Sequence, residues 1–358
     1  MFSQWYFGEN LPTWSLFAEL SLAGLVVILA GSRFAKLADT LATRLHIGGG
    51  WIGLILLATV TSLPELVSGG TATALGNVDL AFGGILGSCS FNITLIFLLN
   101  ALSGGGSVLR NVSPSHTLSA TFGIGLLSLA MFGMVLVEKF TGSPRLTGYV
   151  ELFWAVAILA TYFGCMRLIH RFEKRATAEE PASPSESVEP VIYIAIAVMG
   201  VIIVVASWWL AQIGDVLGTH KIDMIGRPLG ATFVGAVFLA LATSLPEIAT
   251  SVAAVRLGNL DLALGNLFGS NMFNIAVIPV LKGVSLCRGD WLMMPPSAVQ
   301  FTQHMITGIV AIMLTTIAVS GLTYKSKKKM MRRFGFDSIL IVIVYLGGMY
   351  MLLMEYQS

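Results

Sequence analysis

Charged side chains are scarce in this chain. Of its 358 residues, 11% are Asp, Glu, Lys or Arg, whereas an ordinary soluble domain carries about 25%. Hydrophobic residues make up 55% and the mean hydropathy is +0.82. The scarcity of charge excludes a soluble fold and a disordered chain, and the long apolar runs indicate a polytopic membrane protein. A formal net charge of +2 also argues against a nucleic-acid partner.

Cysteine is scarce as well. The three cysteines, Cys89, Cys165 and Cys287, all lie in apolar segments. An odd number within apolar segments is not a disulfide framework, so we predict that they are small buried side chains. Residues 1–10 contain no Lys or Arg, which is not typical of a cleaved signal peptide.

The apolar runs predict an all-α fold of ten transmembrane helices, since a span needs about 20 apolar residues. The predicted spans are 13–32, 51–77, 80–102, 117–137, 147–169, 191–213, 229–255, 260–281, 297–320 and 335–354. The widest gap, 170–190, is charged and contains three prolines. We interpret it as a solvated loop. It divides the chain into a first half (1–170), a linker (171–190) and a second half (191–358).

The distribution of Lys and Arg predicts the orientation. With the N-terminus outside, the inside segments hold 15 of these residues and the outside segments hold 6. The positive-inside rule therefore predicts both termini outside and the 171–190 linker in the cytoplasm. The basic segment 325–333 is then a cytoplasmic topology anchor, with anionic-lipid binding as an alternative.

An internal repeat occurs at a constant offset of 182 residues. Residues 61–65 and 243–247 both read TSLPE, and 19 of 36 positions are identical between 58–93 and 240–275. The offset contains five predicted spans, an odd number, so the second copy must be inverted relative to the first. Two inverted five-helix repeats are typical of secondary transporters, whose site lies between the repeats near the midplane. We therefore expect a transporter and not an enzyme.

Glu65 and Glu247 are the candidate ion-binding carboxylates. Glu65 lies 14 residues into its predicted span, or roughly 21 Å at helical rise. A carboxylate at that depth is costly and indicates a functional site. A lone Glu could instead be protonated and bonded to a neighbouring helix, but its recurrence at the same place in both copies favours function.

Pro64 and Pro246 precede the two glutamates. Proline removes a backbone hydrogen bond and releases carbonyl groups one turn earlier, around Val60–Thr61 and Ala242–Thr243. In hydrocarbon a released carbonyl must find a partner, and a cation would serve. A simple helix kink is the alternative.

The repeated polar residues share helix faces. Ala58, Thr61, Ser62 and Glu65 are related by steps of three and four, and so are Ala240, Thr243, Ser244 and Glu247; Ser88 and Asn92, like Ser270 and Asn274, are four apart. Together these faces supply a hard, all-oxygen set that suits Ca²⁺ or Na⁺ and not Zn²⁺ or Cu⁺. Two carboxylates balance one Ca²⁺ or two monovalent cations.

Small and capping residues recur between the copies. Glycines at 76, 83 and 87 match those at 258, 265 and 269, and we expect them to allow close helix packing. Asn77 and Asp79 match Asn259 and Asp261 in the tight connections between spans. Helix capping is the favoured interpretation, with cation attraction at the mouth as the alternative.

At these residues the chain resembles the sodium/calcium exchangers of the calcium/cation antiporter superfamily. TSLPE at 61–65 and 243–247, with GS-x-x-F-N at 87–92 and 269–274, is similar to that family's two alpha repeats. The resemblance implies that Glu65 and Glu247 hold Ca²⁺ with the carbonyls of Thr61 and Thr243. It implies Na⁺ sites at Ser62, Ser88, Ser244, Ser270 and the carbonyls of Ala58 and Ala240, and a central lining by Asn92 and Asn274. It further implies that the first and sixth helices slide across the core.

The chain departs from the family pattern at several positions. Asn274 stands where many members carry a third carboxylate, Cys89 stands where an Asn is usual, and Gly84 stands opposite Asn266. The calcium/proton signature GNA(T/V)E is absent from both repeats, which favours Na⁺ as the counter-ion. The linker is too short for a calcium-sensing domain, so we predict no regulatory Ca²⁺ site there.

Three other functions compete with Na⁺/Ca²⁺ antiport. A Ca²⁺/H⁺ or other cation/H⁺ exchanger of the same fold is the first, because burial favours the protonated form of a carboxylate. A passive cation channel is the second, and the inverted repeat argues against it. An aspartyl intramembrane protease needs two buried Asp, whereas the seven Asp here fall in predicted loops or span ends.

The remaining expectations concern partners and location. We expect inorganic cations and membrane lipids as partners, no cofactor, no nucleic acid, and function as a monomer. The short linker and the lack of targeting signals favour a prokaryotic inner membrane.

Overall fold

The computed structural model consists of helices throughout the part of the chain that it describes. That part covers residues 13–45, 47–103, 107–110, 112–140, 142–178, 188–219, 240–290, 292, 298–324 and 335–357, and it contains no strand. In the first half the elements are α2 (Thr13–Leu45), α3 (Gly49–Ile52), the π-helix η1 (Gly53–Leu57), α4 (Ala58–Thr61), α5 (Leu63–Ala74), α6 (Val78–Leu102), α7 (Ser115–Lys139) and α8 (Pro144–Ala178). In the second half they are α9 (Pro190–Thr219), α11 (Ala240–Thr243), α12 (Leu245–Arg256), α13 (Leu260–Cys287), α14 (Ala298–Tyr324) and α15 (Phe336–Gln357).

The predicted membrane architecture is confirmed. Within the described residues, nine helical segments are long and apolar enough to cross a bilayer, and they correspond to every predicted span except the seventh. The seventh, 229–255, is described from Ala240 onward as α11 and α12, and its first part lies outside the described residues. The basic segment 325–333 lies outside them too.

Two helices are longer than their predicted spans. Helix α2 has 33 residues and α8 has 35, so both continue well beyond the apolar stretch that hydropathy marks. The end of α8 occupies residues 171–178, where we predicted a loop. Basic residues such as Arg171 and Lys174 can keep their charges in water while the helix continues. The helix therefore does not end where its apolar run ends.

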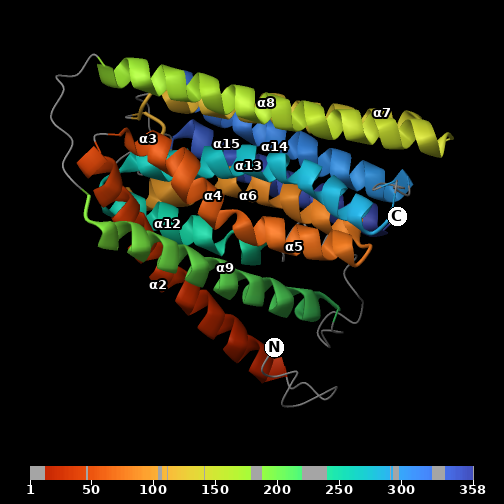
Figure 1. Cartoon of the computed structure of the whole chain (residues 1–358), viewed down its shortest axis with the longest axis horizontal. Coiled ribbons are helices and arrows are strands. Elements are labelled where there is room, and N and C mark those ends of the chain that lie inside the picture. Colours follow the sequence, from red (N-terminus) through yellow and green to blue (C-terminus); the bar gives the residue numbers. More distant parts are fainter. Residues whose placement is uncertain are drawn as a thin grey trace.

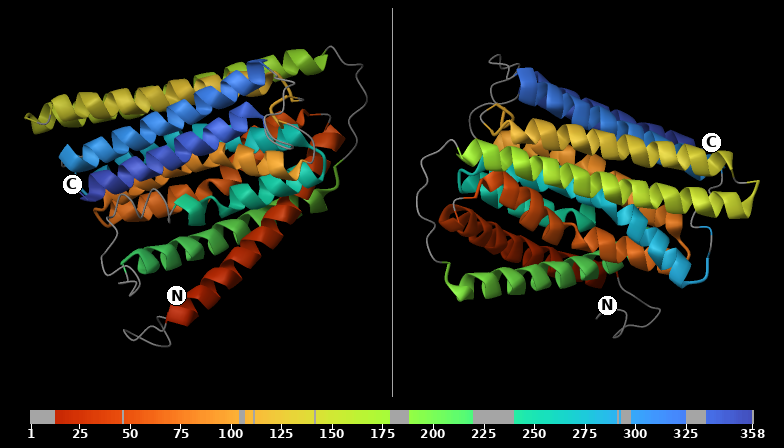
Figure 2. Two further views of the ribbon diagram at one scale, coloured as in Figure 1. Left: turned by 180° about the vertical axis from the view of Figure 1, so that it is seen from behind. Right: turned by 45° about the horizontal axis from the view of Figure 1, so that its top comes forward.

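Helix α13 lies at the centre of the bundle. In its most apolar stretch 89% of residues are buried, against 33% in α2 and 28% in each of α8, α9 and α15. Figure 1 shows α13 and α6 between a layer containing α7, α8 and α14 and a layer containing α2 and α9. Both views in Figure 2 place α2 and α9 together at the outer edge, and α2 packs against α9 and α12. The two central helices therefore carry the residues most shielded from the surroundings.

The two copies of the repeat fold alike. The helix breaks at Ser62 in the first copy and at Ser244 in the second, with Pro in the first turn of the helix that follows. The glycines that end these helices, Gly76 and Gly258, both have positive φ, at 87° and 81°. In the first copy the next helix, α6, is capped by Asn77, whose side chain accepts from the Leu80 N–H at 3.3 Å. In the second copy α13 is capped in the same way by Asn259. Helix capping by the two asparagines is thus confirmed.

The central helices run antiparallel. Asp261, in the first turn of α13, contacts His116 near the start of α7 at 2.8 Å. Helix α7 starts beyond the C-terminal end of α6. Asp79, in the first turn of α6, contacts His304 near the start of α14 at 3.0 Å. Each central helix therefore begins where the other ends, as an inverted repeat requires.

The second span consists of α3, η1, α4 and α5, and we call it the broken span. Glycine allows backbone-to-backbone contact where the broken span crosses α13. A Cβ on Gly53 would meet the carbonyl oxygen of Leu262, and one on Gly269 would meet that of Leu54. Close approach at Gly265 and Gly269 confirms the expected packing role of these two glycines.

The cysteines follow the prediction in two of three cases. Cys89 and Cys165 are buried, but Cys287 is exposed. The prediction for Cys287 was wrong because this residue is the last of α13, where the apolar composition of the helix no longer implies burial.

Candidate cation-binding site

Two broken helices bring the paired glutamates into the interior. Glu65 lies in the first turn of α5 and Glu247 in the first turn of α12. Their exposed fractions are 2% and 0%. The proline before each Glu has no N–H, so it leaves the carbonyl four residues earlier without its helical donor and lets the chain turn at Ser62 and Ser244.

Each carboxylate is held by a hydroxyl of the other repeat. Ser62 donates to Oε1 of Glu247 at 3.1 Å. Ser244 donates to Oε1 of Glu65 at 3.4 Å. Because the two bonds are reciprocal, the first halves of the two TSLPE motifs lie against each other, and the site is formed by both copies together.

A third hydroxyl joins the group from α13. Ser270 donates to Oε1 of Glu247 at 3.3 Å and lies 3.4 Å from the hydroxyl of Thr61. Thr61 in turn lies 3.5 Å from the carbonyl oxygen of Ala58. In the second copy, the hydroxyl of Thr243 lies 3.4 Å from the carbonyl oxygen of Ala240. The residues predicted on these helix faces are thus brought together.

Several buried polar atoms of the predicted set have no hydrogen-bond partner among the described residues. They are Oε2 of Glu65, Oε2 of Glu247, Oγ of Ser88, Oδ1 of Asn92, and both Nδ2 and Oδ1 of Asn274. Buried polar groups are almost always bonded, so each exception calls for an explanation. Five of these six atoms are oxygens, which are the ligands of Ca²⁺ and Na⁺ in proteins.

The donor set is poor in residues that select soft metals. Within the described residues, no three His, Cys, Asp or Glu side chains gather as a metal-binding group. A cation here must therefore rely on hydroxyl, amide and backbone oxygens around the two carboxylates, which is the chemistry of a hard cation.

The two halves of the site differ beside the carboxylates. On the Glu247 side, Asn266 accepts from Thr61 at 3.1 Å and donates to Thr250 and Ser251 at 2.9 and 3.0 Å. On the Glu65 side, the position equivalent to Asn266 is Gly84, which lines a narrow crevice between α5, α6 and α11 that has no room for a water molecule. An amide thus joins the polar groups on one side of the site, and its counterpart on the other side has no side chain.

Some residues of the site were not predicted from the sequence. Asn271 contacts Asn92 at 3.1 Å, and Asn266 bonds to three polar side chains, yet neither was placed in the predicted set. Asn271 and Asn266 are two of the positions at which the repeats differ, and this difference is the signal that could have drawn attention to them.

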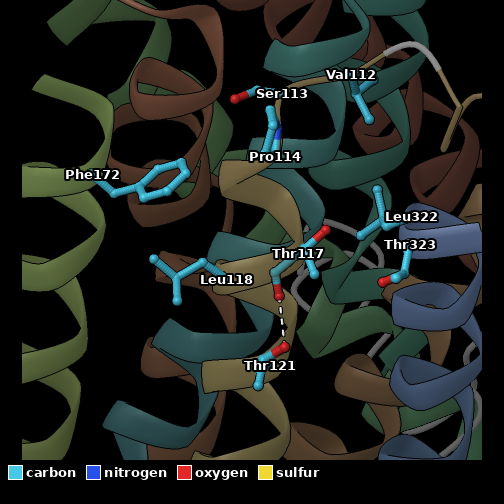
Figure 3. A pocket seen from close by; sticks show the side chains of 9 residues that line it. All are labelled: Val112, Ser113, Pro114, Thr117, Leu118, Thr121, Phe172, Leu322 and Thr323. Carbon is cyan, nitrogen blue, oxygen red and sulfur yellow. Dashed lines mark hydrogen bonds between the residues drawn. The ribbon is translucent and has the colours of Figure 1, made fainter. Parts of the chain in front are cut away.

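Two further pockets lie away from the glutamates. Figure 3 shows one of about 520 Å³ between α7, α8 and α14, where Phe172, Leu118 and Leu322 face a row of threonines. Its nine lining residues include no charged side chain. The other, of about 460 Å³, is a groove along α9 beside Leu56, Val60 and Leu63, and it is lined by aliphatic residues and Tyr193. Neither lining includes a carboxylate.

Comparison with known proteins gives one consistent result. The family model described as sodium/calcium exchanger protein matches residues 15–169 and 191–354. The putative antiporter CaxA of Alkalimonas amylolytica is 25% identical over 92% of this chain and 97% of its own length. The inner membrane protein YrbG of Escherichia coli K12 is 30% identical over 73% of this chain and 77% of its own length.

A solved structure shares the fold. The sodium-calcium exchanger NCX_Mj, soaked with Na⁺ and Sr²⁺, superposes with a TM-score of 0.65 at 18% identity, covering 94% of this chain and 97% of its own. This likeness agrees with the predicted all-α membrane fold. The chain therefore belongs to the sodium/calcium exchanger protein family, and it is an integral membrane transporter of the cation/Ca²⁺ antiporter class.

Proposed function

We propose that the chain exchanges Na⁺ for Ca²⁺ at a single site between Glu65 and Glu247. The observation that carries the proposal is the reciprocal Ser62–Glu247 and Ser244–Glu65 contact, which fixes one oxygen of each buried carboxylate and leaves its Oε2 without a partner. Two fixed carboxylates with unpaired oxygens are suited to hold one divalent cation.

Charge balance supports an exchange of unlike cations. The two carboxylates match the charge of one Ca²⁺ or of two Na⁺, so both loaded forms are close to neutral. A neutral load costs far less to carry through a low-dielectric interior than a charged one. Ca²⁺ and a full Na⁺ load compete for the same oxygens and exclude each other.

We assign the remaining oxygens to Na⁺. Ser62 and Ser88 with the Ala58 carbonyl would serve one flank, and Ser244 and Ser270 with the Ala240 carbonyl the other. Asn92 and Asn274 would line the centre, and the carbonyls of Thr61 and Thr243 would complete the Ca²⁺ shell. Support comes from the burial of all these side chains within 2% exposure.

Alternating access would arise from α2 and α9. These helices lie together at the outer edge of the bundle (Figures 1 and 2), and an apolar groove of about 460 Å³ runs along α9 beside Leu56, Val60 and Leu63. Apolar contacts are not directional, so they resist the sliding of one helix over another less than hydrogen bonds would. The two helices would move as a pair, uncovering the site on one face and then on the other, and the remaining helices of the two five-helix halves (1–170 and 191–358) would stay together as the core.

Na⁺ is favoured over H⁺ as the counter-ion by the hydroxyl set. A proton would need the carboxylates alone, whereas four Ser hydroxyls and two Thr residues surround them here. Asn274 has no proton to release. A Ca²⁺/H⁺ exchanger of the same fold is the second candidate, because two buried glutamates can also carry protons.

We propose a prokaryotic inner membrane as the location, with both termini outside. The relative YrbG is an inner membrane protein, and the 15-to-6 distribution of Lys and Arg supports the orientation. The transported ions and the surrounding lipid are the partners that this function requires, and one chain contains a whole site.

The test is ⁴⁵Ca²⁺ uptake into proteoliposomes loaded with Na⁺ and diluted into Na⁺-free buffer, with the pH equalised by an ionophore. We expect uptake that needs internal Na⁺ and is lost in Glu247→Gln. Uptake that ignores Na⁺ and follows an imposed pH gradient would move the assignment to proton coupling. Uptake without any counter-ion would indicate a channel.

A further inference from the structure

Cys89 and Asn271 are equivalent residues of the two repeats, and they contact each other. The thiol of Cys89 lies 3.8 Å from the carbonyl oxygen of Asn271, to which it donates. The side-chain amide of Asn271 donates to the carbonyl oxygen of Cys89 at 2.9 Å. The two positions differ by the repeat offset of 182, so they lie on the pseudo-twofold axis that relates α6 to α13.

Hydrogen-bond chemistry fixes the orientation of the Asn271 amide. A backbone carbonyl can only accept, so the atom of Asn271 that faces the carbonyl of Cys89 must be Nδ2. Its Oδ1 must then face the other way, where it accepts from Nδ2 of Asn92 at 3.1 Å. Asn92 has its nitrogen engaged, and its Oδ1 is buried without a partner.

The equivalent of Asn92 is not held in this way. Neither Nδ2 nor Oδ1 of Asn274 forms a hydrogen bond of ordinary geometry with a described residue, and the Cys89 thiol makes only a weak contact with it. The reason is that the residue equivalent to Asn271 is Cys89, which has no amide. A thiol is a weak donor and a weak acceptor, and it cannot hold a neighbouring amide by both of its atoms.

We propose that Asn271 is a positioning residue that presents the Oδ1 of Asn92 to the bound cation, and that Cys89 leaves the amide of Asn274 free to rotate. The site then contains one oxygen ligand of fixed direction and one adaptable amide. A fixed oxygen is bound at little reorganisation cost, while a rotating amide can offer its oxygen to one cation load and turn away from another. The proposal rests on the Ca²⁺ site proposed above.

The test compares the two asparagines in two backgrounds. Equilibrium binding of ⁴⁵Ca²⁺ to the purified full chain in detergent would be measured for Asn92→Ala and Asn274→Ala. In the natural background we expect Asn92→Ala to weaken binding about 10-fold, since a preoriented ligand is lost, and Asn274→Ala to weaken it less. Asn271→Ala should resemble Asn92→Ala.

The second background exchanges the two axial residues, as Cys89→Asn with Asn271→Cys. The amide on the axis then belongs to the first repeat and holds Asn274 instead of Asn92. We expect the order of the two alanine effects to reverse. A residue that merely filled space would not produce this reversal, and the exchange conserves the atoms of the core. Cys165→Ala, a buried thiol on α8, is the control for loss of a thiol.

The outcomes separate the two proposals. The same order of effects in both backgrounds would overturn the positioning role while the Ca²⁺ site stands. A natural chain that binds no ⁴⁵Ca²⁺ would overturn the proposed function and this inference with it. Reversal together with Na⁺-independent transport would support the positioning role and reject only the counter-ion.

Discussion

Ser62 and Glu247 are 185 residues apart, and the hydroxyl of the first donates to Oε1 of the second at 3.1 Å. The bond crosses between the two copies of the repeat, and the bond from Ser244 to Glu65 crosses in the opposite direction. A substitution in one copy is therefore expected to act on the carboxylate of the other.

Ser62→Ala should lower the apparent affinity for Na⁺ more than it lowers the stability of the fold. The change removes one of the two hydroxyls that donate to Oε1 of Glu247, and a hydrogen bond to a carboxylate contributes about 1.5–3 kcal/mol. We expect the Na⁺ concentration for half-maximal ⁴⁵Ca²⁺ uptake to rise about 10- to 100-fold, as this energy implies.

Ser119→Ala is the matched control for Ser62→Ala. Ser119 is also a buried helical serine, but it donates to the carbonyl of Ser115 in its own helix α7. Its Na⁺ dependence should be that of the natural chain. Equal effects of the two substitutions would show that loss of any buried hydroxyl is enough, and would contradict the cross-repeat role.

Replacement of Glu65 should separate charge from position. Glu65→Gln keeps the size and loses the charge, and we expect exchange to fall by about 100-fold or more, since loss of a buried charged ligand costs several kcal/mol. Glu65→Asp keeps the charge with a shorter reach, and it should retain weak exchange. Proteoliposome uptake of ⁴⁵Ca²⁺ measures both. An Asp variant as inactive as the Gln variant would contradict this expectation and would mean that the charge does not suffice without the reach of the Glu side chain.

Two glycines on α13 should respond oppositely to the same change. A Cβ at Gly269 would meet the backbone of Leu54 and the side chain of Ala58, whereas nothing lies within 4 Å of one at Gly283. We expect Gly269→Ala to cost about 1–3 kcal/mol through overpacking. Gly283→Ala should raise stability slightly, since Ala restricts the unfolded chain. Thermal unfolding in detergent reports both, and a harmless Gly269→Ala would contradict the close packing at this crossing.

A buried ion pair connects α8 to α13. Lys282 and Glu151 lie 2.6 Å apart, with side chains 3% and 0% exposed. Removing one partner leaves a buried charge, so Lys282→Met or Glu151→Gln should lower the free energy of unfolding by about 3–5 kcal/mol.

The double variant, Lys282→Met with Glu151→Leu, tests whether the pair itself matters. Replacing a buried pair by apolar residues of similar volume is often nearly neutral, so we expect recovery of most of the lost thermal stability. A double variant that is as unstable as the sum of the single ones would show that each residue acts through other contacts.

Cys287 should report the orientation of the chain. It is exposed at the end of α13, while Cys89 and Cys165 are buried. With both termini outside, this end of α13 faces outward, and a membrane-impermeant maleimide should label intact cells at Cys287. Cys287→Ser should abolish the labelling. Labelling that requires broken cells would reverse the proposed orientation.

Much of the fold could be predicted from the sequence because hydropathy and proline act locally. The spans follow from apolar runs, and the breaks at Ser62 and Ser244 follow from Pro64 and Pro246, which cannot donate. The lengths of α2 and α8 could not be predicted in the same way, because a helix continues into water whenever its side chains tolerate solvent.

The site was predicted less completely for a related reason. The shared helix faces identified Glu65 and Glu247 within single segments, but the contact of Ser62 with Glu247 depends on how two distant segments pack. Asn271 has no local signature at all, since its role follows from lying on an axis opposite Cys89. His116 and His304 were missed because a lone histidine on an apolar helix carries no motif.

The reciprocal bonds between the copies bear on how such a chain could have arisen. A polypeptide with one repeat would hold a Glu whose Ser donor is missing, since that donor comes from the other copy. Because α6 and α13 are antiparallel, the missing half would have to enter the membrane in the opposite direction. A single-repeat ancestor with this site would thus have needed dual topology, assembling as an antiparallel homodimer before duplication and fusion joined the two orientations in one gene.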